Sequence, residues 1–199
     1  MADRDAQIIQ AVLGGEIDRY AELVDAYQGM ALRLAFSLLG NYEDAKDVSQ
    51  EAFVSAYQAL GRFRGGAKFS TWLYRIIVNE CRDAVRRRVR QPAVVATVGE
   101  PDPDASERPE LFIDVDDPRA DPSDQLATRE LSQRLSASIG ALPDKQRTAF
   151  VLHHLHGLSL DEVAAVMGCR VGTVKSHVFR ATKHLRNQLG PWLREEGIG

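Results

Sequence analysis

Apolar residues recur at intervals of three and four along the first 60 residues, a spacing that predicts helices rather than strands. A first set marks one buried face of a helix over residues 17–34: Ile17, Tyr20, Leu23, Val24, Tyr27, Met30 and Leu34. Gly40 and Asn41 then interrupt the pattern, and a second set with the same spacing occupies residues 45–60. We therefore expect two amphipathic helices that are separated at Gly40.

A loop and a further helix follow. The adjacent glycines Gly65 and Gly66 predict a loop over residues 63–68. We expect the next helix to be capped by Ser70 or Thr71. It carries apolar residues at core-like spacing, namely Phe69, Trp72, Ile76 and Ile77. We therefore interpret Trp72 as a structural residue rather than a stacking platform for a base, while Tyr74 and Arg75 fall on other faces.

The last third of the chain is again helical in pattern. A first helix is predicted over residues 126–139, and Leu142–Pro143–Asp144 opens a second helix that ends at Gly157. Ser159 caps a short helix closed by Gly168, and a last helix covers about residues 172–189. A short helix, a tight turn and a second helix form the layout of a helix-turn-helix.

Residues 91–125 differ from the segments on both sides. Between Gly99 and Asp124 there are ten acidic residues, two arginines and five prolines, without hydrophobic periodicity. Proline and like charge disfavour a packed core, so this stretch is predicted to be a flexible acidic linker. The expected fold class is all-α, with two small helical domains, residues 1–90 and 126–199, joined by the linker 91–125.

The formal net charge of −3 conceals two basic regions. Residues 62–90 contain nine Lys or Arg against Glu80 and Asp83, and residues 163–192 contain five Lys or Arg and no acid. The acidic linker cancels these charges in the total. Each domain therefore offers a basic surface of the kind that binds nucleic acid.

The cysteines and the apolar runs limit the kinds of protein that this chain can be. Cys81 and Cys169 are far apart and form no CxxC pair, which argues against a disulfide framework and against a thiolate zinc site. The start of the chain lacks a signal-peptide pattern, and no apolar run is long enough to span a bilayer. We expect a soluble cytoplasmic protein without a metal or cofactor.

The helix-turn-helix suggests which side chains meet DNA. The N-terminal end of its second helix enters the major groove. Residues at that end are candidates for base contacts: Val171, Thr173, Lys175, Ser176 and His177. Arg180 and Lys183 are assigned to phosphates, which position the protein without specifying sequence. Lys145, Arg147 and Arg170 are further candidates for phosphate contacts, and a neutral His177 suggests a pH-dependent contact.

Long motifs in both domains resemble those of a known family. Residues 47–53 match its DVxQEaF pattern, and residues 63–79 match FRGxxxFxTWLyrIaxN nearly completely. Residues 142–181 resemble LPxxqRxxfxLxxxxGLsxxEiAxxxgxxxGTVKSrxxRA. This order is that of the extracytoplasmic-function (ECF) sigma factors of bacterial RNA polymerase. Two departures are His177 and Thr182, which stand where the family usually has basic residues.

The resemblance implies a promoter-recognition subunit that is not an enzyme. The first domain would bind the clamp coiled coil of the polymerase's largest subunit through Asp47, Gln50 and Glu51, with Val48 and Phe53 in the core. The second domain, near the polymerase flap, would read the minus-thirty-five element. An anti-sigma factor is expected as a further partner.

The same resemblance assigns the opening of the minus-ten element to the first domain. The loop before its last helix supplies cations and close backbone access, and an unpaired base needs both a pocket and neutralised phosphates. The residues expected to contact this element are Arg64, Lys68, Asn79, Arg82 and Arg86.

Several alternatives stay open. The linker is a plain tether, a segment that threads the polymerase cleft, or an acidic partner for the protein's own basic faces. A different DNA-binding regulator would use the helix-turn-helix as its only DNA contact. An enzyme would rest on His153 and His156, which have metal-ligand spacing, with His154, Asp161 and Glu162 nearby.

Overall fold

The computed structural model describes residues 2–90 and 122–195, with side chains described over 4–88 and 131–192. Nearly all of these residues are helical, and the described ranges contain no strand. The chain divides into two compact units, Met1–Pro109 and Glu110–Gly199. The prediction of an all-α chain with two helical domains is therefore confirmed. Most of the expected linker lies outside the described residues.

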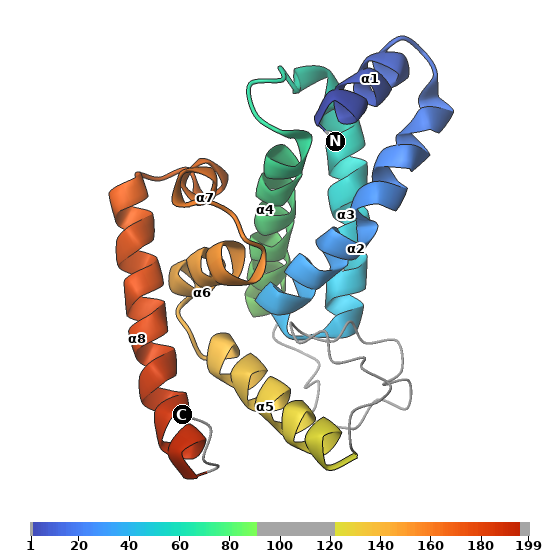
Figure 1. The fold of residues 1–199 in the computed structure, drawn as a ribbon. Helices are drawn as coiled ribbons and strands as arrows, with labels where there is room; N and C mark the ends of the chain where they lie inside the picture. Colours follow the sequence, from blue (N-terminus) through green and yellow to red (C-terminus); the bar gives the residue numbers. More distant parts are fainter. Residues whose placement is uncertain (1, 91–121, 196–199) are drawn as a thin grey trace. The chain divides into compact units, whose positions relative to one another are not determined.

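The first unit is a bundle of helices (Figure 1). Its elements are α1 (Ala2–Leu13), the 3₁₀ turn η1 (Ile17–Arg19), α2 (Tyr20–Leu39), α3 (Tyr42–Ala59), the 3₁₀ turn η2 (Leu60–Arg62) and α4 (Phe69–Arg90). Helices α2, α3 and α4 pack against one another, and α1 packs against α2 and α4. The packing buries apolar side chains from each helix, including Ile8 of α1, Leu34 of α2, Val48 and Phe53 of α3, and Ile77 of α4.

Local chemistry explains the break between α2 and α3. Gly40 closes α2 with a φ of 73°, a left-handed conformation that favours glycine. Asn41 then caps α3, because its side-chain oxygen accepts a 2.9 Å hydrogen bond from the backbone N–H of Asp44. The predicted separation at Gly40 and Asn41 is confirmed.

The start of α4 differs from the prediction. The N–H of Trp72 donates to the carbonyl of Lys68 at 3.2 Å, so the helix begins at Phe69 and Lys68 occupies the capping position. Ser70 and Thr71 lie inside the first turn, and the expectation that one of them caps the helix is wrong. The aromatic side chain of Phe69, which is only 2% exposed, draws the first turn into the core.

Four aromatic rings pack around this helix start. Phe69 lies 5.4 Å from Tyr27 and 5.9 Å from Phe63 between ring centroids, and Trp72 lies 5.4 Å from Phe63 and 5.7 Å from Phe69. Such tilted and edge-on contacts stabilise a core beyond the area that they bury. Trp72, which is half-buried, therefore takes part in the packing at the start of α4, as its core-like spacing predicts.

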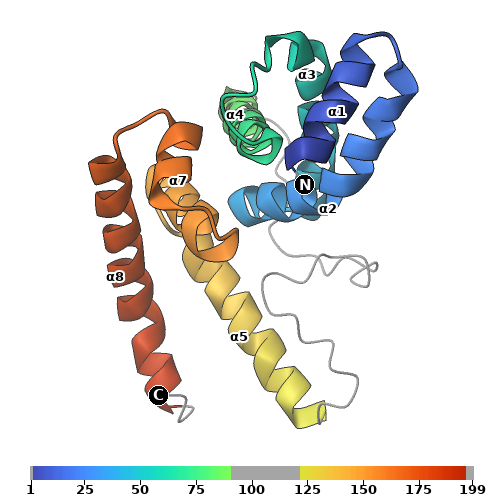
Figure 2. The ribbon, with the colours of Figure 1, turned by 45° about the horizontal axis from the view of Figure 1, so that its top comes forward.

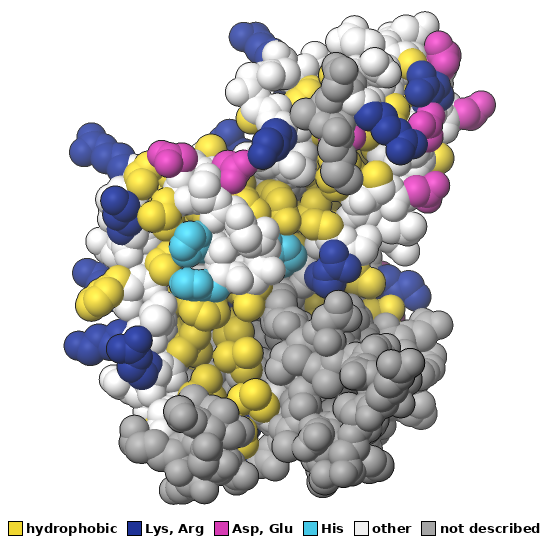
Figure 3. Space-filling view, viewed as in Figure 1, with side chains coloured by type: hydrophobic (Ala, Val, Ile, Leu, Met, Phe, Trp, Pro, Cys, Tyr) yellow, Lys and Arg dark blue, Asp and Glu magenta, His cyan; other side chains and the backbone are white. Residues whose placement is uncertain are grey.

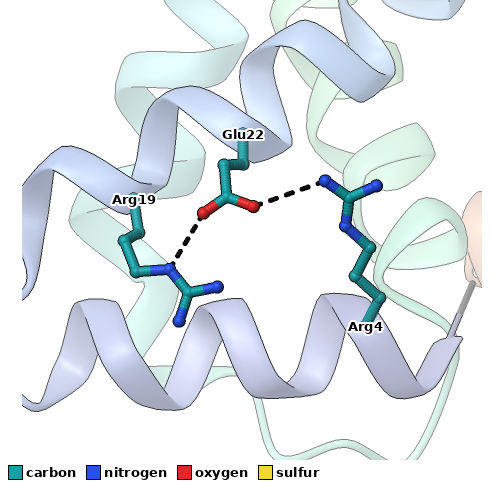
Figure 4. A network of polar contacts seen from close by, with 3 residues as sticks. All are labelled: Arg4, Arg19 and Glu22. Atoms are coloured by element: carbon teal, nitrogen blue, oxygen red, sulfur yellow. Dashed lines mark hydrogen bonds and ion pairs between the residues drawn. The ribbon is translucent and has the colours of Figure 1, made fainter.

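Polar contacts join α1 to the rest of the first unit. Glu22 of α2 accepts from Arg19 at 2.9 Å and from Arg4 of α1 at 3.4 Å, so one carboxylate bridges two arginines (Figure 4). The hydroxyl of Tyr27 donates a 2.6 Å hydrogen bond to Asp5, whose side chain is buried. The contacts of Arg4 and Asp5 therefore attach α1 to α2. None of the sequence motifs described above includes residues of α1.

The second unit contains the helix-turn-helix. Its elements are α5 (Pro122–Gly140), α6 (Asp144–Phe150), the π-helical segment η4 (Val151–Leu155), α7 (Leu160–Met167) and α8 (Val171–Glu195). Helix α5 begins before the expected domain start at residue 126, and α8 extends beyond the expected end at Leu189. Helices α5, α6 and α7 all pack against α8 (Figure 2).

Strong local signals fix the ends of α7. Ser159 and Glu162 form a reciprocal capping box, in which each side chain accepts from the other residue's backbone N–H. Gly168 ends the helix with a φ of 64°. The carbonyl of Arg170 accepts from the N–H groups of Thr173 and Val174, so α8 begins at Val171, three residues after Gly168.

Apolar spacing over residues 160–178 predicts a small core of the helix-turn-helix, made of Leu160, Val163, Ala164, Met167, Val174 and Val178. Val163, Ala164 and Val174 are buried, whereas Leu160, Met167 and Val178 are half-buried. Val166 is also buried, at 3% exposure, although its spacing did not single it out. Within the described residues, no helix has the length and apolar character needed to cross a membrane.

Candidate nucleic-acid interface

Helix α8 has one buried and one exposed face along its N-terminal half. Val174, Ala181 and Leu185, at i, i+7 and i+11, are buried. Most of the residues expected to contact DNA are exposed: Arg170, which directly precedes the helix, and Thr173, Lys175, Ser176, Arg180 and Lys183 within it. Figure 3 shows Lys and Arg side chains projecting over α8. The helix therefore holds its basic groups out of the domain core, where they are available to a ligand.

Two predicted contact residues are partly withdrawn from solvent. Val171 and His177 are half-buried. Nδ1 of His177 is buried and has no hydrogen-bond partner among the described residues. Burial lowers the pKa of His177, and the positive charges of Lys145 and Arg180 lower it further. The positive charges of Lys145 in α6 and Arg180 in α8 thus both act on His177 and favour its neutral form.

Phe179 was not singled out by the sequence analysis. It is 69% exposed, and it lies between Ser176, three residues before it, and Lys183, four residues after it, on the outer side of α8. Its helical position opposite Ala181 and Val174 could have revealed it. An exposed aromatic ring among cations adds an apolar contact to a surface that is otherwise polar.

Helix α4 presents a second basic face. Asn79 and Arg86 are exposed, Arg82 is half-buried, and Arg64 and Lys68 are exposed in the loop that precedes the helix. Gly65 in that loop has a φ of 68°, which a residue with a side chain rarely adopts. All five residues expected to contact the minus-ten element are thus at least partly accessible.

The neighbouring residues Tyr74 and Arg75 lie in different surroundings on α4. Arg75 is exposed and precedes Asn79 by four residues and Arg82 by seven, so it shares their face. The expectation that Arg75 lies off the core face is confirmed. Tyr74 is buried, at 8% exposure, so the expectation that it also lies off the core face is wrong.

The acidic face of α3 is also exposed. Asp47, Gln50 and Glu51 point away from the core, and Val48 and Phe53 are buried, at 3% and 8% exposure. Val54, three residues after Glu51, is 57% exposed and adds an apolar side chain to the same side of the helix. This side of α3 therefore combines negative charge with exposed apolar area.

The histidines do not assemble a metal site. Nδ1 of His153 lies 2.7 Å from the carbonyl oxygen of Leu158, a hydrogen bond that ties the turn at Gly157 to η4. His154 packs on the ring of Phe150, with 4.7 Å between centroids. Within the described part of the chain, no three His, Cys, Asp or Glu side chains are grouped as metal ligands would be.

Comparison with known proteins gives matches over both units. Residues 23–91 match the family model for Sigma-70 region 2, and residues 132–185 match that for Sigma-70, region 4. The chain is 36% identical over 196 residues to the RNA polymerase sigma-H factor of Pseudomonas aeruginosa, covering 97% of both chains. It is 35% identical over 181 residues to the ECF RNA polymerase sigma factor SigW of Bacillus subtilis, covering 91% of this chain and 94% of that protein.

A solved structure shows the same fold. The sigma factor RpoE of Bartonella quintana, in complex with the anti-sigma factor NepR, superposes with a TM-score of 0.61 at 26% identity. The superposition covers 84% of this chain and 98% of the RpoE chain. Family models in both units, together with curated relatives matched over nearly their whole length, show that this chain belongs to the ECF group of RNA polymerase sigma factors.

Proposed function

We propose that this sigma factor directs core RNA polymerase to its promoters by reading the minus-thirty-five element as duplex and opening the minus-ten element. The observation that carries the proposal is the outer face of α8, which is exposed and basic directly opposite a buried face. A capped α7 and the glycine turn support that helix as a helix-turn-helix requires.

The residues proposed to contact the minus-thirty-five element fall into two groups, one for base edges and one for phosphates. Lys175 and Ser176 lie in its first turns, which enter the major groove, and are assigned to base edges together with Val171, Thr173 and His177. Arg180, Lys183 and Arg170 are assigned to phosphates. Phe179 offers an apolar contact suited to a thymine methyl group.

The first unit would act on the minus-ten element. Its outer α4 face and preceding loop carry Arg64, Lys68, Asn79, Arg82 and Arg86, to which the structure adds Arg75. Asn79 is the one uncharged polar member of this set, so it is assigned to an unpaired base, whereas the cations neutralise the separated strands. The aromatic cluster around Phe69 and Trp72 would hold this face rigid while the duplex opens.

The acidic face of α3 would bind polymerase. Asp47, Gln50 and Glu51 are proposed to contact the clamp coiled coil of the largest subunit, and the second unit would lie near the flap. An anti-sigma factor is a further proposed partner, because RpoE of Bartonella quintana was solved in complex with one. On this proposal the protein works in the cytoplasm and is a transcription initiation factor rather than an enzyme.

Run-off transcription with core polymerase and a genomic promoter library tests the proposal. We expect specific transcripts only when this chain is added. Arg180→Ala should weaken transcription from every template. Asn79→Ala should fail on duplex promoters but recover on templates with a pre-opened minus-ten segment, which the Arg180 variant should not do.

Two outcomes would contradict the proposal. Tight, sequence-specific duplex binding without polymerase, and with no transcript, would favour a regulator that uses the helix-turn-helix alone. An Asn79→Ala defect that pre-opened templates fail to rescue would remove this residue from strand opening.

A further inference from the structure

Two ion pairs tie the end of α4 to α3. Nη2 of Arg87 lies 2.9 Å from Oε2 of Glu51, and Nη1 of Arg88 lies 3.0 Å from Oδ2 of Asp44. A hydrogen bond from Ser55 to Glu80, 2.7 Å long, joins the same two helices nearer the start of α4. We refer to Asp44, Glu51, Arg87 and Arg88 as the α3–α4 clasp.

The three consecutive arginines Arg86, Arg87 and Arg88 have different kinds of partner. Arg86 pairs with Asp83 of its own helix at 3.2 Å and stays on the outer face of α4, seven residues after Asn79. Arg87 and Arg88 are instead turned toward carboxylates of another helix. All three arginines of the run are therefore paired with carboxylates in the free chain, and only Arg87 and Arg88 pair with a carboxylate of α3.

The clasp also involves the surface proposed for polymerase. Glu51 is one of the three residues assigned to the clamp coiled coil, so Arg87 and a basic group of the polymerase would share one carboxylate. A cation brought by a partner weakens the attraction between Glu51 and Arg87, because it repels the Arg87 guanidinium and competes with it for the oxygens of Glu51. The guanidinium groups set free at the end of α4 would lie on the helix that is proposed to bind DNA.

We propose that the α3–α4 clasp couples the two binding surfaces: Arg87 and Arg88 are held by Glu51 and Asp44 in the free chain, and are released to DNA phosphates when a partner occupies those carboxylates. This inference rests on the proposed function, because it takes α3 as the partner surface and α4 as the DNA surface. Binding of polymerase and of DNA by the first unit then strengthen each other by the same factor.

The strength of the clasp suits an exchangeable contact. The side chains of Arg87 and Glu51 are 59% and 46% exposed, and those of Arg88 and Asp44 are 62% and 43% exposed. Ion pairs that are this accessible to water change an equilibrium by about twofold to fivefold each, and salt weakens them. The clasp therefore lowers the DNA affinity of the free chain modestly and can open without unfolding the helices.

A double-mutant cycle on the full chain without polymerase tests the clasp. The probe is a fluorescein-labelled single-stranded DNA of mixed sequence, measured by anisotropy at low salt. Glu51→Gln should bind it about twofold to fivefold more tightly than the wild type. Glu43→Gln removes the same charge from an exposed position of the same helix and is the matched control, expected to have a clearly smaller effect. In an Arg87→Gln background, Glu51→Gln should have no further effect.

A second measurement reads the partner side. Arg87→Gln leaves Glu51 to the polymerase alone, so it should bind core polymerase about twofold to fivefold more tightly in the absence of DNA. Circular dichroism of each variant checks that α3 and α4 remain folded.

Three results would overturn the inference: an equal gain for Glu43→Gln and Glu51→Gln, a gain that persists without Arg87, or weaker polymerase binding by Arg87→Gln. The last result would mean that Arg87 orients Glu51 for docking. These failures differ from failure of the proposed function, in which the wild-type chain would give no promoter-specific transcript at all.

Discussion

The hydroxyl of Tyr27 in α2 donates a 2.6 Å hydrogen bond to Oδ2 of Asp5 in α1, and both residues are buried, at 7% and 6% exposure. Burial raises the pKa of Tyr27 well above its usual range, and the Asp5 carboxylate raises it further. The phenol is therefore a permanent donor at neutral pH. It supplies α1 with a specific attachment to the bundle in addition to apolar packing.

Tyr27→Phe should lower the free energy of unfolding by about 1–3 kcal/mol, because the buried carboxylate of Asp5 loses its hydrogen-bond donor. Urea denaturation followed by circular dichroism measures the change. Tyr57→Phe is the matched control, since Tyr57 is 40% exposed, and it should change stability by less than about 0.5 kcal/mol. Equal effects of the two substitutions would show that the Tyr27 hydroxyl contributes nothing special.

The turn of the helix-turn-helix depends on one backbone conformation. Gly168→Ala should destabilise the second unit by about 1–2 kcal/mol, because its φ of 64° is unfavourable for a residue with a Cβ. Gly172→Ala, in the first turn of α8 with open space around the added Cβ, should be neutral or stabilise by up to about 1 kcal/mol. Thermal unfolding of both variants compares them, and a loss of stability at residue 172 alone would contradict this account.

The assignment of Arg180 and Lys183 to phosphates predicts a change in salt dependence. Replacing either residue by Ala should weaken binding to all duplex sequences alike and reduce the slope of log affinity against log salt by about 1. Lys175→Ala should instead change which minus-thirty-five sequence is preferred. Anisotropy titrations over a series of salt concentrations, with two unrelated duplexes, distinguish these roles. A sequence-dependent loss for Arg180→Ala would move that residue to the base contacts.

His177 predicts a pH-dependent contact with DNA. Burial and the nearby charges of Lys145 and Arg180 lower its pKa below the usual 6.5, so the imidazole is neutral at pH 7. A DNA phosphate favours the charged form, so lowering the pH below 6.5 should tighten duplex binding. The expected gain is that of one exposed ion pair, about twofold to fivefold. His177→Gln should remove it, whereas His184→Gln, at an exposed position of the same helix, should retain it.

The lowered pKa of His177 also affects the stability of the fold. Acid pH is expected to tighten DNA binding but to destabilise the folded chain. Because the folded pKa of His177 lies below its unfolded value, the unfolded chain binds the proton more readily. The stability that neutral His177 contributes is present above pH 6.5 and is lost as the pH falls through the folded pKa. Acid titration of the unfolding free energy should therefore be shallower in His177→Gln than in the wild type. If the unfolding free energy of the two proteins changed with pH in the same way, protonation of His177 would not destabilise the folded chain.

Much of the fold follows from short-range patterns. Gly40, Asn41, Ser159 and Gly168 act on the backbone within one helical turn, and each ends or begins a helix where the sequence analysis expects it. Apolar spacing also identified most of the core, including Phe69 and Ile77. The exposed positions of Arg75 and Phe179 were accessible to the same reasoning, since both follow from helical spacing alone.

The sequence by itself determined the helical class, the two-domain organisation, the helix-turn-helix and the family motifs, because these depend on composition and on residues a few positions apart. Only the tertiary structure decided that α4 begins directly after Lys68, that the charge of Lys145 acts on His177, and that Arg87 and Arg88 pair with Glu51 and Asp44. Those relationships arise where helices distant in the sequence pack together. A long, charged side chain can reach several partners, and the packing of the helices selects one of them.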